Sequence, residues 1–295
     1  MKTFFTEMRS TDCIAMHGVL FEPDEKTDTI VIHHHGIEGN FYENTFIPFM
    51  AEAYTSAGIA FMTYNNRGHD YICDLKMDTS DGVKSLKGGT AFEKIADNAM
   101  DVEGAVKYCE SRGYTKIILQ GHSSGANKIV YAIAEKKISV YATILLSPCD
   151  DFGLYVSETS AEEISSYRQL AKRMIDEGKE EEFMPREAYM GTLISSRTYL
   201  ECSEEGSAID VFPYRDEKNP FVYFSKIKTP IFVSFGTDGD YLLQEFSYAE
   251  KLLNSKKAKE AEISFNLIKG AAHNYRNYEQ ELSNKIVDWI CNMKK

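Results

Sequence analysis

The hydrophobic positions of this chain alternate between short continuous runs and helical spacings. Short apolar runs bounded by glycine, asparagine or proline predict strands, whereas apolar residues that recur every three or four positions predict helices. The runs predict strands over residues 28–35, 59–64, 116–120, 139–146, 230–236 and 263–268. The helical spacing predicts helices over residues 46–57, 91–111, 124–137, 242–253 and 282–291. Such alternation indicates βαβ units, and therefore an α/β protein with a mostly parallel central sheet flanked by helices.

Two stretches interrupt this alternation. Residues 65–89 are rich in glycine and aspartate, and we predict a loop there. Residues 151–226 are acidic, have helical spacing from Ser160 to Gly178 and contain no obvious core strand. Insertions of this kind often cover a binding site. We therefore expect one core formed by residues 1–150 and 227–295, with residues 151–226 as a helical cap or lid. The alternative is a solvated helical excursion whose aromatic residues pack against one another.

Composition and charge narrow the classes of partner. The chain has 295 residues, of which 43% are hydrophobic, and a formal net charge of −12. An acidic protein is poorly suited to nucleic acid or to an anionic membrane, and no apolar run reaches the roughly 18 residues of a membrane span. The six cysteines are scattered without a CxxC pair, and the N-terminus lacks the apolar segment of a signal peptide. We expect reduced thiols and a cytoplasmic location, and the oligomeric state stays open.

The stretch QGHSSGA at residues 120–126 stands where a predicted strand passes into a predicted helix. Gly-x-Ser-x-Gly in this position is typical of a nucleophile elbow, whose glycines permit a crowded turn that exposes the serine oxygen. Ser123 is then the nucleophile, and the N–H of Ser124 at the helix start is one donor of an oxyanion hole. The alternative is an ordinary tight turn between a strand and a helix.

A second oxyanion donor is expected in the loop after an earlier strand. That loop reads HGIEGN from His35, and we predict that the N–H of Ile37 is the donor while the His35 side chain braces the loop. The run of His33, His34 and His35 also raises the possibility of a metal. Neighbouring strand residues point to opposite faces, however, so the three rings cannot easily ligate one ion, and we expect no metal.

A serine nucleophile also needs a base and an acid. His273, in GAAHNY directly after the last predicted strand, is the candidate base. The acid is expected after the preceding strand, in the sequence FGTDGDY. The commonest spacing would place it at Gly239, between two aspartates. We favour Asp240, because a turn longer by one residue is tolerated there, and Asp238 is the alternative.

The segments HHHGIEGN, YNNRGHD, GHSSG, PIFVSFGTDGD and GAAHNY, with Ser, Asp and His in that order, resemble the α/β-hydrolase superfamily. The likeness covers nearly the whole chain outside residues 151–226. Within the superfamily, residues 88–133 followed by ILLSPCDD resemble the siderophore-esterase-like branch. The resemblance implies the α/β-hydrolase fold and a serine hydrolase mechanism without a cofactor. The sequence departs from the superfamily pattern at one position, since Gly239 stands where the acid usually lies.

The sequence therefore predicts a serine hydrolase that cleaves a small-molecule carboxylic ester through a Ser-His-Asp triad and an acyl-enzyme intermediate. Two alternatives stay open. The same triad also serves amidases, lactonases and acyltransferases, and a protein of this fold can bind a ligand without turnover.

Overall fold

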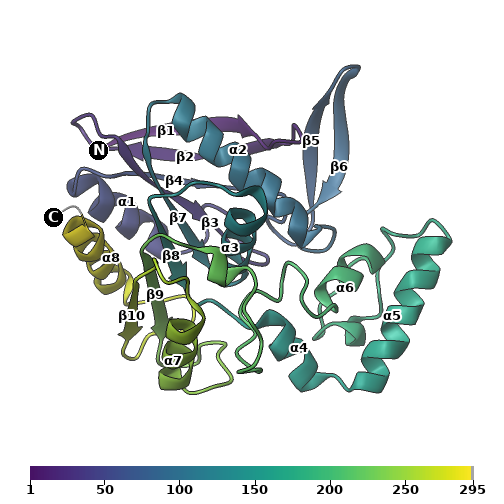
Figure 1. The fold of residues 1–295 in the computed structure, drawn as a ribbon. Coiled ribbons are helices and arrows are strands. Elements are labelled where there is room, and N and C mark those ends of the chain that lie inside the picture. Colours follow the sequence, from purple (N-terminus) through teal and green to yellow (C-terminus); the bar gives the residue numbers. More distant parts are fainter. Residues whose placement is uncertain (294–295) are drawn as a thin grey trace.

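A mixed sheet of eight strands runs through the molecule (Figure 1). The computed structural model describes residues 1–293. The strands of this sheet, in spatial order, are β1 (Lys2–Arg9), β2 (Ala15–Glu22), β4 (Ala60–Tyr64), β3 (Thr29–His34), β7 (Lys116–His122), β8 (Ala142–Leu146), β9 (Ile231–Gly236) and β10 (Ile263–Ile268). The pairs β1–β2 and β2–β4 are antiparallel, and every other neighbouring pair is parallel. The predicted mostly parallel sheet is confirmed.

Helices cover both faces of this sheet. They are α1 (Phe46–Ser56), α2 (Asn98–Ser111), α3 (Ser124–Lys136), α7 (Phe246–Lys256) and α8 (Glu279–Met293). The buried residues of α1 and α8 form one apolar cluster with one face of the sheet, whereas those of α2, α3 and α7 form another with the opposite face. The central strands are therefore buried on both sides, which explains why they read as continuous apolar runs rather than as alternating patterns.

Alternation along a strand distributes its side chains between these two clusters. In β3, Ile30 and Ile32 belong to the cluster with α2 and α3, whereas Val31 belongs to the cluster with α1 and α8. All three side chains are buried. Parallel strands sandwiched in this way bring their carboxyl ends to one edge of the sheet, where ligands bind in open α/β folds.

The prediction of a loop over residues 65–89 is wrong for residues 73–88, whereas residues 65–72 are irregular as predicted. Residues 73–88 form an antiparallel hairpin, β5 (Cys73–Thr79) and β6 (Gly82–Gly88), which projects from the body of the molecule in Figure 1. Most of its residues are exposed, so both faces carry polar side chains and the usual alternation of apolar and polar positions is weak. Its turn is Ser80-Asp81, followed by Gly82, and a cluster of serine, aspartate and glycine of this kind was the available signal of a turn.

Other boundaries differ by a few residues. The helix predicted from residue 91 begins with a short 3-10 turn, Ile95–Asp97, and becomes α2 only at Asn98. The strand predicted over residues 139–146 is shorter, and the helices predicted over residues 242–253 and 282–291 are displaced or longer. The antiparallel strands β1 and β2 at the sheet edge had no predicted counterpart, and most residues of β1 are exposed. No helix within residues 1–293 is both long enough and apolar enough to cross a membrane.

Residues 151–226 divide into two parts. The last part, which includes Phe212 and the 3-10 turn Phe224–Lys226, packs into the core cluster with α2, α3 and α7. The first part forms a helical lobe beside the sheet, with α4 (Asp151–Glu158), α5 (Ala161–Asp176), α6 (Ser196–Cys202) and the 3-10 turn Arg186–Ala188 (Figure 1). It has an apolar cluster of its own, which includes the aromatic residues Phe152, Tyr155, Tyr189 and Tyr199. The Glu201 carboxylate accepts hydrogen bonds from the N–H groups of Ile95 and Ala96, at 2.5 and 2.8 Å. The lobe is therefore packed internally and attached to the segment that precedes α2.

Candidate active site

Ser123 occupies the sharp turn between β7 and α3. Its backbone has φ 57° and ψ −136°, a region that costs a non-glycine residue about 1–3 kcal/mol. Both flanking glycines are required by close backbone approach. A Cβ at Gly121 would collide with the Gly125 carbonyl oxygen, and a Cβ at Gly125 would collide with the His34 carbonyl oxygen. The two glycines therefore let the strand, the helix and the neighbouring β3 meet at this turn, which holds Ser123 in a strained conformation.

His273 and Asp240 come together from the loops that follow β10 and β9. The Nδ1 of His273 lies 2.6 Å from Oδ1 of Asp240, and the Asp240 side chain is only 1% exposed. The two strands are parallel neighbours, so their carboxyl ends deliver both side chains to the same edge of the sheet. The alternative acid, Asp238, is exposed, and its backbone N–H donates to the Ala271 carbonyl oxygen. Asp240, rather than Asp238, is thus the aspartate in contact with the imidazole.

Several donors fix the Asp240 carboxylate. The Ser147 hydroxyl donates to Oδ2 at 2.7 Å, and the Gly236 N–H donates to the same oxygen at 3.0 Å. Burial alone would raise the pKa of this carboxyl. The hydrogen bond and charge of His273, together with the Ser147 and Gly236 donors, outweigh burial and hold the pKa of Asp240 below its ordinary value. The carboxylate is therefore ionised and oriented toward the imidazole.

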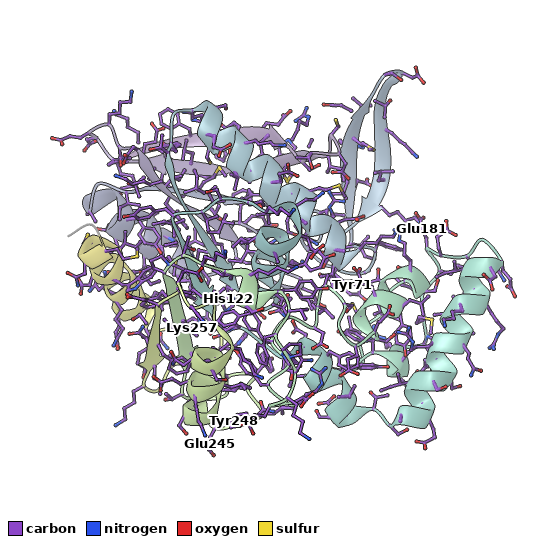
Figure 2. The ribbon with its side chains drawn as sticks, viewed as in Figure 1. Tyr71, His122, Glu181, Glu245, Tyr248 and Lys257 are labelled. Carbon is purple, nitrogen blue, oxygen red and sulfur yellow. The ribbon has the colours of Figure 1, made fainter. Side chains whose placement is uncertain are left out.

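The side chain of Ser123 faces a thiol. Its Oγ lies 4.0 Å from the Sγ of Cys149, and among residues 1–293 it has no hydrogen bond to His273. The two elements are nevertheless close, because Nε2 of His122 lies 2.9 Å from the His273 carbonyl oxygen and the two rings are 4.9 Å apart. His122 lies near the centre of the molecule in Figure 2. The structure thus brings the histidine loop beside the turn that carries Ser123.

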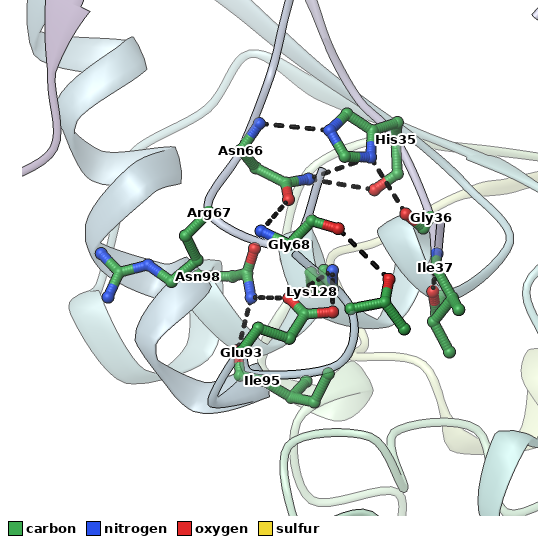
Figure 3. Close-up of polar contacts among 12 residues, drawn as sticks. His35, Gly36, Ile37, Asn66, Arg67, Gly68, Glu93, Ile95, Asn98 and Lys128 are labelled. Carbon is green, nitrogen blue, oxygen red and sulfur yellow. Dashed lines mark hydrogen bonds and ion pairs between the residues drawn. The ribbon is translucent and has the colours of Figure 1, made fainter. Parts of the chain in front are cut away.

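The loop after β3 is tied to its surroundings by three neighbouring residues. Asn66 N–H donates to Nε2 of His35 at 3.1 Å, so the imidazole links this loop to the one after β4 (Figure 3). The N–H of Ile37 donates to the Ser124 hydroxyl oxygen at 2.8 Å. The N–H of Glu38 donates to the Thr90 hydroxyl oxygen at 2.7 Å. The two backbone groups predicted to form an oxyanion hole therefore belong to residues that are hydrogen-bonded to each other.

The histidines of the HHH run are separate buried groups. Nδ1 of His33 lies 2.9 Å from Gln120 Nε2, and Nδ1 of His34 lies 2.7 Å from the Tyr64 hydroxyl. Burial lowers the pKa of His33 to about 3 and holds the pKa values of His34 and His35 well below their usual range. Within residues 1–293, no three histidine, cysteine, aspartate or glutamate side chains are grouped in a way that would hold a metal ion.

A buried ion pair lies beneath this loop. Nζ of Lys128, on α3, is 2.8 Å from Oε2 of Glu93, and both side chains are 0% exposed. Asn98 Nδ2 donates to the same carboxylate oxygen at 2.8 Å. Figure 3 shows the pair next to Gly68, where a Cβ would collide with the Glu93 carboxylate. The ion pair therefore joins α3 to the segment before α2 at the base of the candidate site.

A family model described as "Protein of unknown function (DUF1749)" matches residues 85–294, which is more than half of the chain. The chain belongs to the DUF1749 family. The matched region of this DUF1749 protein contains Ser123, Asp240 and His273 and excludes β1 to β4. No curated protein matches the sequence.

Solved structures resemble this DUF1749 protein along nearly its whole length. The siderophore hydrolase EstB from Aspergillus fumigatus has a TM-score of 0.73 and 11% identity, covering 100% of this chain and 98% of its own. Est1E from Butyrivibrio proteoclasticus, solved with ferulic acid bound, has a TM-score of 0.64 and 16% identity, covering 98% and 100%. The esterase Pf2001 from Pyrococcus furiosus has a TM-score of 0.60 and 16% identity, covering 99% and 91%.

These comparisons confirm the predicted fold. The neighbours are esterases and hydrolases, and the DUF1749 protein has the α/β-hydrolase fold that they share. At such low identities the likeness establishes the fold and not the substrate.

Two polar residues near the site were not predicted from the sequence, namely Ser147 beside Asp240 and Cys149 beside Ser123. Both follow β8 directly, so their position at the carboxyl end of a parallel strand was the available signal.

Proposed function

We propose that this protein is a serine hydrolase that cleaves a carboxylic ester of a small molecule. Ser123 is the nucleophile, His273 the base and Asp240 the acid that orients the imidazole. The observation that carries the proposal is the 2.6 Å contact between His273 and Asp240, placed beside the strained turn of Ser123. Fold alone would not support it, because the same fold serves many reactions.

The first step is the addition of the Ser123 oxygen to the ester carbonyl. Nδ1 of His273 donates to Asp240, so the neutral ring has its lone pair on Nε2, the nitrogen that accepts the serine proton. A rotation of the Ser123 side chain from Cys149 toward His273 brings the two groups together. Catalytic hydrogen bonds of this kind are often long before substrate binds. The ionised Asp240 then stabilises the imidazolium that forms.

The tetrahedral intermediate places a negative charge on the former carbonyl oxygen. The backbone N–H of Ser124 stands at the start of α3, where unpaired N–H groups favour an anion. The loop after β3 approaches the same turn, because a Cβ on Gly36 would lie 3.0 Å from Ser123 Cβ. Collapse of the intermediate releases the alcohol, which takes its proton from His273. Water activated by the same histidine then releases the acid and restores Ser123.

Residues 151–226 are the proposed cap. The segment begins two residues after Cys149, whose thiol faces Ser123, so it leaves the core beside the nucleophile. Most of its aromatic residues are used in packing. Phe152, Tyr155, Tyr189 and Tyr199 belong to the cluster of the lobe itself, and Phe212 and Tyr214 belong to the core cluster with α2 and α3. Phe183 is 40% exposed and packs against Phe92, with 5.3 Å between the ring centroids.

A fluorophosphonate probe tests the nucleophile directly. We expect the wild-type protein to be labelled at Ser123 and to hydrolyse p-nitrophenyl esters, and Ser123→Ala to lose both properties, with a fall in kcat of about 10⁶-fold. Ser283→Ala is the control, since Ser283 lies in α8 and donates to the Glu279 carbonyl oxygen, outside the proposed triad. Labelling of Ser123→Ala equal to that of the wild type would remove Ser123 as the nucleophile.

The choice of acyl acceptor and bond is tested on the same preparation. An esterase releases free acid from aryl and short acyl esters, whether or not amines are added. Transfer of the acyl group to an added amine, or a preference for anilides or lactones over esters, would assign the triad to one of the related reactions instead. Stable binding without turnover of any member of the panel would point to a binding protein.

A further inference from the structure

Two hydroxyl groups support the loop after β3 in unequal ways. The Thr90 hydroxyl accepts from the Glu38 N–H and donates its own proton to the Gly68 carbonyl oxygen at 3.2 Å. The Ser124 hydroxyl accepts from the adjacent Ile37 N–H at 2.8 Å. Among residues 1–293, however, no group accepts the Ser124 proton. A serine hydroxyl offers one proton and two lone pairs, so Ser124 keeps a free donor where Thr90 does not.

This free donor is buried and lies close to the nucleophile. Ser124 is 0% exposed, so solvent does not satisfy its proton. Buried polar groups nearly always have partners, and an exception needs an explanation. A Cβ built on Gly36 would lie 3.0 Å from Ser123 Cβ and 3.3 Å from Ser124 Oγ, so the nucleophile and the hydroxyl contact the same point of the loop. The hydroxyl that carries the unused proton therefore packs against the same glycine of the loop as the Ser123 side chain.

The Ile37 N–H is correspondingly not free. Its hydrogen is directed at the Ser124 oxygen, so it cannot bind an oxyanion at full strength while that bond persists. A hydroxyl that accepts a hydrogen bond becomes a better donor, because neighbouring hydrogen bonds polarise one another in a site of low dielectric constant. The N–H of Ile37 therefore polarises the Ser124 hydroxyl and makes its O–H a stronger donor.

We propose that the Ser124 side chain is itself an oxyanion donor, with the Ile37 N–H acting through it. The inference rests on the proposed function and adds a side-chain donor to the backbone N–H of the same residue. No proton is transferred in this step. The hydroxyl turns its O–H toward the developing negative charge and keeps its acceptor bond from Ile37. In this role Ser124 is a catalytic residue, since its hydroxyl would contact the reacting oxygen once a substrate carbonyl lies beside Ser123.

The test compares Ser124→Ala with the wild type in steady-state hydrolysis of p-nitrophenyl butyrate. We expect kcat to fall by about 10²- to 10³-fold with little change in KM, as for the loss of one oxyanion donor. Ser124→Cys preserves the side-chain shape but supplies only a weak S–H donor, so its kcat should lie between those of the wild type and Ser124→Ala. Ser283→Ala should retain wild-type kinetics.

A second comparison separates donation from bracing. Thr90→Val removes the other hydroxyl that supports the same loop, and we expect it to change kcat much less than Ser124→Ala does. Equal losses in the two variants would overturn the proposal, because both would then report a loosened loop.

A Ser124→Ala rate equal to or above that of the wild type would also overturn it, since the freed Ile37 N–H would then be the true donor. If Ser124→Ala does not fold, Ser124→Cys is the deciding variant. A wild-type kcat in Ser124→Cys would then contradict donation by the Ser124 hydroxyl to the oxyanion. Failure of the proposed function itself is recognised separately, as a wild-type protein that neither reacts with the fluorophosphonate nor turns over ester.

Discussion

The two sides of the candidate site are held in different ways. On the side of the loop after β3, the supporting groups are His34, His35 and the Lys128–Glu93 pair, all fully or almost fully buried. On the opposite side, His273 and Asp240 stand on loops whose neighbouring residues are largely exposed. Here a few side-chain hydrogen bonds, chiefly from Ser147 to Asp240, replace the buried network.

Because of this difference, substitutions on the two sides are expected to affect different properties of the protein. Loss of a group from the buried side removes a partner from a polar atom that has no water to replace it, so the cost appears as lost stability. On the acid–base side an isosteric substitution of Asp240 keeps an oxygen for the Ser147 and Gly236 donors, and the loops around it are largely exposed, so we expect the fold to stay intact. The cost there appears as lost turnover. Substitutions on the two sides are therefore expected to give opposite combinations of stability and rate.

The largest effect is expected on the acid–base side, from Asp240→Asn. An asparagine amide has one oxygen that accepts hydrogen bonds, and Ser147 and Gly236 already donate to one oxygen of Asp240. The amide therefore cannot also accept from His273 Nδ1 in the same way, and the imidazole loses its orientation and its tautomer. We expect kcat for ester hydrolysis to fall by about 10⁴-fold, while the melting temperature changes little. Asp238→Asn, two residues earlier on the same loop, is the control and should keep the wild-type rate. A reversed pattern would transfer the role of the acid to Asp238.

A large loss of stability is expected on the buried side, from Lys128→Met. The substitution leaves the Glu93 carboxylate buried without its cation, which typically costs about 3–5 kcal/mol in the free energy of unfolding. Urea denaturation measures this cost. Glu93→Gln added to Lys128→Met should recover most of the loss, because the amide is neutral and still accepts from Asn98.

A surface pair provides the control for Lys128→Met. Lys107 and Glu103, an i,i+4 pair on α2, are 2.7 Å apart with the lysine side chain 61% exposed. Lys107→Met should therefore cost less than about 1 kcal/mol. Equal costs at the two sites would contradict the distinction between buried and solvated support.

A smaller effect is expected from pH. Burial lowers the pKa values of His33, His34, His35 and His122, those of His33 and His122 to about 3. The unfolded chain takes up protons at these histidines below about pH 6.5, whereas the folded protein does not. Stability is thus fully present at neutral pH and falls as the pH decreases below 6.5, by up to about 1.4 kcal/mol per pH unit for each histidine.

Urea midpoints measured between pH 7.5 and pH 5 test this dependence. His34→Gln should reduce the slope, and His17→Gln, at an exposed histidine of β2, should not. A stability that is constant across this range, or that rises toward acid, would contradict the burial of neutral histidines.

The sequence predicted the parallel part of the fold because those strands are buried on both faces and their apolar runs have no competing interpretation. It did not predict the β5–β6 hairpin or β1, whose exposed residues lack that signal. At the site, local motifs indicated Ser123, His273 and the aspartate pair. The choice between Asp238 and Asp240 depends on how the loop folds back onto β10, which spacing along the chain does not encode. The pairing of Lys128 with Glu93 is equally non-local.

The short segment between β8 and α4 has a mechanical consequence. Within five residues it supplies the hydroxyl that holds Asp240, the thiol that faces Ser123 and the first residue of the helical lobe. Five residues span at most about 18 Å, too short a tether to absorb a rigid tilt of α4. A ligand that displaces the lobe would therefore shift the residues that contact Asp240 and Ser123 together. Substrate entry and the alignment of the triad are thus mechanically coupled.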